Sequence, residues 1–142
     1  MYKRQVDAAL ARLEQLARRH QGEAVAVVTT GELSVPLRGA VGTGGRNLQF
    51  ALRCAEQIDG SEITALSCGT DGVVGNAPGA GAVVDGQTAA RARAEGLNVS
   101  AHLRLRDAYP LLKQLGCTVE PGPTGVNVRD LRILLRLSLI HI

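Results

Sequence analysis

The stretch GTGGRNLQF, residues 42–50, decides how the fold is read, because a glycine-rich turn runs directly into a helical pattern. Glycines permit backbone conformations with positive φ and let a ligand approach the main chain. Free N–H groups at a helix N-terminus favour an anion, because the unpaired amides and the helix dipole point the same way. Arg46 in the first turn adds a guanidinium that can form two hydrogen bonds to a phosphate or a carboxylate. A tight turn with a solvent-exposed arginine is the plainer interpretation of the same residues.

Outward from this turn, the apolar residues follow helical and extended patterns in alternation. Helical spacing predicts a helix from residue 6 that Gly22 ends, and further helices over 48–58, 85–95, within 98–106, and 107–115. Apolar runs predict strands at 24–28, buried between helices, at the edge position 34–38, and at 63–68, 117–119 and 131–135. Residues 73–82 are too small and glycine-rich for a helix interior and are interpreted as a loop that lines a site. These patterns predict a single small α/β domain with a mixed, largely parallel sheet flanked by helices.

Polar glycine turns follow two of the predicted strands, at 29–32 and 69–72, and a third turn lies at 122–127. Ligands of α/β sheets bind at the carboxyl ends of the strands. Glu32 in the first turn is therefore a candidate acid facing a ligand or a metal, although an ordinary turn carboxylate explains it equally simply. Two strands that both end in such turns indicate a site more specifically than either turn alone.

Both ends of the chain look foreign to the rest. The codons GTG TAT AAG AGA CAG can encode residues 1–5, and their reverse complement encodes residues 137–141. This DNA resembles the transposon end used in sequencing-library adapters. We therefore interpret 1–5 and 137–142 as adapter-derived tails around an internal piece, 6–136, of a longer gene, and set the tails aside.

Composition narrows the classes of partner. The net charge of +3 includes Lys3 and Arg4, so the remaining piece carries only +1. With Phe50 and Tyr109 as its only aromatic residues, it offers no stacking platform for nucleic acid. No apolar run reaches the roughly 20 residues that span a membrane. Three cysteines without C-x-x-C spacing suit buried thiols in a reducing cytoplasm better than disulfides or zinc, which favours a cytoplasmic location.

Several common catalytic motifs are missing from the sequence. It contains neither a P-loop nor the dinucleotide fingerprint G-x-G-x-x-G, and it has no G-x-S-x-G elbow. Lys113, the one lysine outside the tails, falls on a predicted surface helix and is not placed for catalysis. His102 is interpreted as a surface histidine, since no second ligand lies at metal spacing. What remains is an anion-binding half-site built from Arg46, main-chain amides, Asp71 and Glu32.

Five segments together resemble one family. They are TTGE (29–32), GTGGRNLQFAL (42–52), ALSCGTDGVVG (65–75), GAGAVVDGQTAARARAEGL (79–97) and GPTGVNVRDL (122–131). In this order they resemble the C-terminal MOFRL domain of class II glycerate kinases, which phosphorylate D-glycerate with ATP and are often labelled hydroxypyruvate reductases. The resemblance covers nearly all of residues 6–136. It implies ATP and Mg²⁺ as cofactors, glycerate as substrate, and a site in the cleft beside an N-terminal Rossmann-like domain that this piece lacks; a homodimer is left open.

The resemblance also assigns roles to residues. Arg46 is the arginine that contacts phosphate or glycerate and is the residue expected to be catalytic, while Asp71 faces substrate or magnesium. The predicted substrate- and phosphate-binding residues are Gly44, Gly45, Asn47, Glu32, Thr70, Asp71, Thr124, Gly125 and Asn127, with Asp71 also the predicted metal ligand. The chain departs from the family pattern where Val74 and Pro78 replace two acids, and where Thr29, Thr30 and Val126 replace other motif residues.

The sequence therefore predicts a fragment of an ATP-dependent glycerate kinase, inactive alone. Two alternatives stay open at this stage. One is an NAD(P)H-dependent hydroxypyruvate reductase, whose dinucleotide fingerprint would lie outside this piece. The other is a non-catalytic ligand-binding module, which the two missing acids favour.

Overall fold

The computed structural model of the chain describes residues 2–32, 42–73 and 75–137. Its helices are α1 (Tyr2–Arg19), α2 (Arg46–Gln57), α3 (Thr88–Ala94), α4 (Val99–Arg104) and α5 (Ala108–Gln114). Its strands are β1 (Val25–Thr30), β2 (Ile63–Gly69), β3 (Gly81–Asp85), β4 (Thr118–Val119) and β5 (Asp130–Arg136). None of the helices in these ranges is long and apolar enough to cross a membrane.

The five strands form one sheet in the order β1-β5-β2-β3-β4, and every neighbouring pair is antiparallel. The α/β class predicted from the sequence is confirmed, whereas the largely parallel sheet is wrong. The chain does cross from β1 through α2 to β2, and those two strands run in the same direction. However, β5 lies between them and pairs antiparallel with both. β5 thus lies where β1 and β2 would otherwise have paired with each other in parallel.

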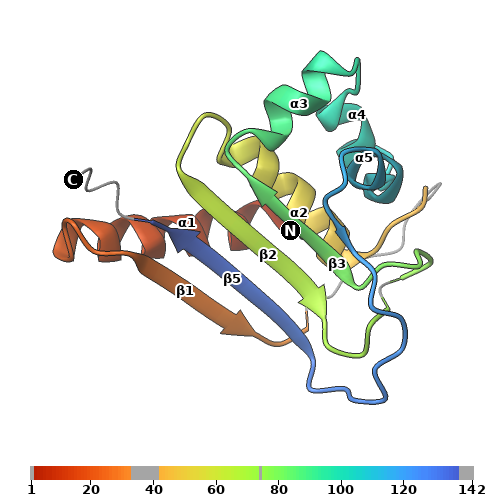
Figure 1. The fold of residues 1–142 in the computed structure, drawn as a ribbon, viewed down its shortest axis with the longest axis horizontal. Coiled ribbons are helices and arrows are strands. Elements are labelled where there is room, and N and C mark those ends of the chain that lie inside the picture. The colour runs from red at the N-terminus through yellow and green to blue at the C-terminus, as the bar shows by residue number, and fades with distance from the viewer. Residues whose placement is uncertain (1, 33–41, 74, 138–142) are drawn as a thin grey trace.

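Two helices pack on one face of the sheet, as Figure 1 shows, with α1 behind β1 and β5 and α2 behind β2 and β3. Side chains that point to these helices, among them Val27, Ala65 and Leu134, form the core with the apolar faces of α1 and α2. The smaller helices α3, α4 and α5 contact α2 rather than the centre of the sheet.

The opposite face of the sheet carries an apolar row with no helix over it in the described ranges. Val28, Ile133, Leu66 and Val83 are register partners across four strands. Val28 is 60% exposed and Val83 41% exposed, so the predicted burial of residues 24–28 between helices is wrong. The physical reason is that all the packed helices lie on one side, which leaves alternate residues of the strands toward solvent.

Most of the predicted helices and strands are present, with three informative differences. The segment 73–82, interpreted as a loop, contains the start of β3, whose small residues pair with β2. The helix predicted from residue 85 begins at Thr88. Asp85 is instead the last residue of β3, and its Oδ1 accepts from the N–H of Gln87. Helix α1 begins at Tyr2, within the segment interpreted as a foreign tail. The edge strand predicted at 34–38 lies outside the described residues.

Candidate anion-binding site

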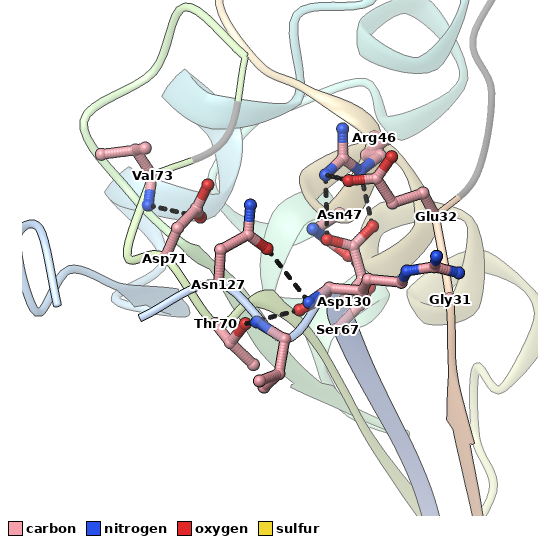
Figure 2. A network of polar contacts seen from close by, with 12 residues as sticks. Gly31, Glu32, Arg46, Asn47, Ser67, Thr70, Asp71, Val73, Asn127 and Asp130 are labelled. Atoms are coloured by element: carbon pink, nitrogen blue, oxygen red, sulfur yellow. Dashed lines mark hydrogen bonds and ion pairs between the residues drawn. The ribbon is translucent and has the colours of Figure 1, made fainter. Parts of the chain in front are cut away.

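The glycine turns meet at one edge of the sheet because of the strand directions. β1 and β2 both end at this edge, and β5, antiparallel to both, begins there. In the register, Thr30 faces Leu131 and Gly69 faces Asp130. The N-terminus of α2 lies at the same edge, so the side chains of Glu32, Arg46 and Asp130 come together in Figure 2, while Asp71 stands apart from them beside Val73.

Arg46 is the centre of this cluster. Its Nε donates to Oδ2 of Asp130 at 2.5 Å and its Nη2 donates to Oδ1 of the same carboxylate at 3.0 Å. Glu32 approaches from the outside, with its Oε1 3.5 Å from Nη2. The hydrogen bond to Asp130 raises the pKa of Arg46, and the charges of Asp130, Glu32 and Asp71 act in the same direction against the effect of burial. Arg46 therefore stays charged and held, with 32% of its side chain exposed.

Asp130 is a site residue that the sequence analysis missed. Its side chain is only 1% exposed, and Nη2 of Arg132 lies 3.7 Å from Oδ2, the oxygen that also accepts from Nε of Arg46. Arg132 also donates from Nη2 to the carbonyl of Gly31 at 2.8 Å and stacks over the ring of Phe50. The available signal was an acid immediately before an apolar strand and three residues after the third glycine turn. A buried carboxylate between two arginines is thereby built into the start of β5.

The turn after β2 and the loop before β5 are bonded to each other. Thr70 binds the carbonyl of Arg129 through both its N–H (3.2 Å) and its Oγ1 (2.7 Å), and its Oγ1 accepts from the N–H of Val128. Thr124 donates from Oγ1 to the carbonyl of Thr70 at 2.6 Å and from its N–H to the carbonyl of Asp71. The predicted site residues Thr70 and Thr124 thus use their hydroxyls to join two loops.

Close main-chain contacts hold these loops in place. Gly72 has φ +92°, and a Cβ at this position would collide with the carbonyl oxygen of Gly122. Asn76 attaches the neighbouring segment to the turn before α2. Its Oδ1 accepts from the N–H of Gly44 at 2.9 Å, its Nδ2 donates to the carbonyl of Gly42, and its own N–H donates to the carbonyl of Gly44. These contacts hold the loops at 69–72 and 122–127 against each other and attach the segment after β2 to the turn at 42–44.

The main-chain N–H groups of the glycine turn at 42–44 are already hydrogen-bonded, and the unbonded N–H groups begin at residue 45. The N–H groups of Gly42, Thr43 and Gly44 donate to Leu105, Asp107 and Asn76 respectively. Asp107, the residue before α5, accepts from the N–H of Thr43 and makes no cap hydrogen bond. The N–H groups of residues 45–48 donate to nothing within the described part of the chain, as expected for the first turn of α2.

The remaining predicted residues lie differently. Asn47 is fully buried, and its Oδ1 accepts from the hydroxyl of Ser67 at 2.7 Å, so its side chain points into the core next to Arg46. Asn127 is exposed and accepts from the N–H of Arg129 at 3.1 Å. Gly125 lies in the exposed loop with φ +74°. The structure therefore brings Glu32 and Arg46 together, whereas Asp71 bonds Val73 and Thr124, and Asn47 and Asn127 make internal contacts.

The described residues form a small α/β domain, with helices on one face of an antiparallel sheet and with glycine turns that are hydrogen-bonded to one another at one edge. The family model described as "MOFRL family" matches residues 25–130. The chain belongs to the MOFRL family.

Two relatives and one solved structure are similar to this chain. D-glycerate 2-kinase from Thermotoga maritima is 41% identical over 109 residues, which is 76% of this chain and 26% of that protein. A protein of Agrobacterium vitis with the provisional name of hydroxypyruvate reductase is 39% identical over 115 residues, 79% of this chain and 26% of its own length. The crystal structure of glycerate kinase from Thermotoga maritima superposes with a TM-score of 0.80 at 33% identity, covering 95% of this chain and 33% of that one. The chain thus spans about a quarter of the length of the curated relatives it matches.

Proposed function

We propose that this chain is the C-terminal part of a longer kinase that transfers a phosphoryl group from ATP to D-glycerate in the cytoplasm. In this proposal it supplies the anion-binding half of a site shared with a further domain, and it is inactive alone. Membership of the MOFRL family and the identity to a D-glycerate 2-kinase support the kinase. The matched stretch is 76% of this chain but only 26% of that relative, which supports the further domain.

The observation that carries the proposal is the placement of Arg46. Its guanidinium is half-buried, charged and fixed at an edge where the main-chain N–H groups of residues 45 and 46 are also free to donate within the described structure, while those of the fully buried residues 47 and 48 are not open to solvent. Phosphoryl transfer needs little covalent chemistry from the protein, and positioning and charge stabilisation supply most of the rate. A fixed arginine beside free amides provides that stabilisation for a phosphate or a carboxylate.

The donors near Arg46 partly fit a magnesium ion. No group of three or more His, Cys, Asp or Glu side chains that could hold a metal occurs among the residues with described positions. Magnesium in phosphoryl-transfer sites is held by one or two carboxylates together with substrate phosphates. Asp71 is the residue that would hold it here, because only one of its oxygens accepts a hydrogen bond, from the N–H of Val73, and the other makes none with the described residues. Bound there, the ion would neutralise charge on the phosphates.

The hydroxypyruvate reductase and the non-catalytic module remain as rivals. The provisional name of the Agrobacterium vitis relative favours the reductase for that protein. The residues that replace two family acids, Val74 and Pro78, favour the module. Val74 lies outside the described residues, so the effect of its substitution is left to experiment.

The test is a pair of assays on the longer protein, recovered by extending the reading frame upstream of this chain. ADP formation from ATP with D-glycerate supports the kinase, whereas oxidation of NADH or NADPH with hydroxypyruvate and no ADP would replace it with the reductase. Binding of glycerate and ADP by calorimetry without turnover in either assay would leave the ligand-binding module. The 142-residue chain assayed alone should be inactive, and turnover by it would refute a shared site.

A further inference from the structure

We propose that Asp130 is a positioning residue that fixes Arg46 so that one edge of its guanidinium stays available to an anion. This inference rests on the proposed function, because it assigns a purpose to a contact at the same site. It concerns a residue to which the resemblance assigns no role.

The geometry divides the guanidinium into a held side and an open side. Asp130 takes Nε and Nη2 through its two oxygens, in the bidentate arrangement that arginine and carboxylate prefer. Nη1 makes no hydrogen bond with any residue of the described ranges. The orientation of the planar group is therefore set from one side, and its remaining donors point away from Asp130.

The two carboxylates beside Arg46 differ in how firmly they are held. Asp130 is 1% exposed and begins a strand that pairs on both sides, so it cannot follow a moving arginine. Glu32 is 55% exposed and stands at an ion-pair distance rather than a hydrogen-bond distance from Arg46. Asp130 is thus the permanent partner of Arg46, and Glu32 is a partner that an incoming anion can displace.

The charges make that displacement possible. Asp130 is shared between Arg46 and Arg132, so the three groups together keep one positive charge. Glu32 opposes this charge with its Oε1 3.5 Å from Nη2, and the charge of Asp71 acts on Arg46 as well. A carboxylate that displaces Glu32 brings the same single negative charge to Arg46, and a phosphate brings a larger one. Arginine has many rotatable bonds, so an arginine already fixed loses less freedom when the anion arrives.

The chain contains a second arginine–aspartate pair for comparison. Arg93 donates to Asp59 from Nη1 and Nη2 and not from Nε, and it lies at the surface with 61% of its side chain exposed. If burial of the carboxylate is what fixes Arg46, the two arginines should behave differently in the same sample. The pair Arg93–Asp59 also supplies a control substitution far from the site.

The experiment measures solvent exchange of arginine Nε–H protons by ¹⁵N NMR on the 142-residue chain, with inorganic phosphate as the probe. In the wild type, the Nε–H of Arg46 should exchange at least about tenfold more slowly than that of Arg93, and phosphate should shift the Arg46 signal. Asp130→Asn should raise the exchange rate of the Arg46 Nε–H to that of Arg93 and abolish the shift of the Arg46 signal by phosphate. Asp59→Asn should leave both the exchange rate of Arg46 and its shift by phosphate unchanged.

The outcomes separate this inference from the proposed function. If phosphate shifts Arg46 equally in the wild type and in Asp130→Asn, anion binding stands and the role of Asp130 is refuted. If phosphate shifts Arg46 in neither, the proposed anion site fails and the inference falls with it. Backbone amide spectra show whether Asp130→Asn is folded. If it is not, equal exchange of Arg46 and Arg93 in the wild type still refutes a fixed arginine, and slower exchange of Arg46 supports it.

Discussion

Asn47 and Ser67 lie 20 residues apart in the chain, and the hydroxyl of Ser67 donates to Oδ1 of Asn47 at 2.7 Å where both side chains are fully buried. Asn47 follows Arg46 directly, yet the two side chains point to different places in Figure 2. One reaches the polar edge and the other joins helix α2 to strand β2. The first turn of α2 therefore contributes Arg46 to the site and Asn47 to the core.

The contact predicts a stability effect at Asn47. Asn47→Ala should lower the free energy of unfolding of the chain by about 1–3 kcal/mol, because the buried hydroxyl of Ser67 loses its acceptor. Gln57→Ala, at an exposed position of the same helix, should change it by less than about 0.5 kcal/mol. Urea unfolding measures both. Loss of glycerate binding in the longer protein with unchanged stability would show instead that Asn47 contacts the ligand.

Arg46 should matter for turnover in the longer protein. Arg46→Ala should lower kcat by roughly 10²–10³, as when a preorganised donor to a developing negative charge is removed. Arg93→Ala removes a surface arginine of the same chain and should leave kcat unchanged. Steady-state assays with ATP and D-glycerate compare them, and a kcat for Arg46→Ala equal to that of the wild type would remove Arg46 from the catalytic site.

Gly72 should tolerate alanine poorly. Gly72→Ala combines a positive φ with a collision against the carbonyl of Gly122, whereas Gly60→Ala meets a positive φ alone, with no neighbour within 4 Å. The first should cost about 1–3 kcal/mol more than the second in thermal or urea unfolding, because overpacking adds to backbone strain. Equal costs would mean that the loops at 69–72 and 122–127 are free to separate.

The three thiols should react in order of their burial. Desolvation raises the pKa of Cys54 to about 12, and it also raises the pKa of Cys68, which is the least buried of the three. Iodoacetamide near pH 8 should therefore label Cys68 first and Cys54 last, since only the thiolate reacts. Mass spectrometry of timed samples measures the order, and early labelling of Cys54 would show that the core opens.

The same shift of Cys54 gives a direction for stability against pH. Its folded pKa lies above the ordinary value of 9.0, so its contribution is complete below pH 9 and is lost as pH rises toward 12. In that window the unfolded chain releases the proton while the folded chain keeps it. Cys54→Ala should make the decline in stability shallower between these pH values, as measured by urea unfolding at each pH. An unchanged slope would contradict the burial of this thiol.

The sequence by itself determined the local elements and the family. Helix α2 follows from apolar residues at helical spacing, and β2 from a short apolar run, because both patterns depend on neighbours in the chain. The glycine turns were recognisable for the same reason, and with them the resemblance to the MOFRL family, which the comparison confirmed.

The tertiary structure alone decided the strand order and the partner of Arg46. Insertion of β5 between β1 and β2 pairs residues about a hundred positions apart, and local patterns carry no information on such pairing. That insertion places Asp130 under Arg46, 84 residues away in the chain, and makes the sheet antiparallel. It also leaves the row through Val28 and Val83 uncovered, since which face a helix covers is settled by how the whole chain folds back on itself.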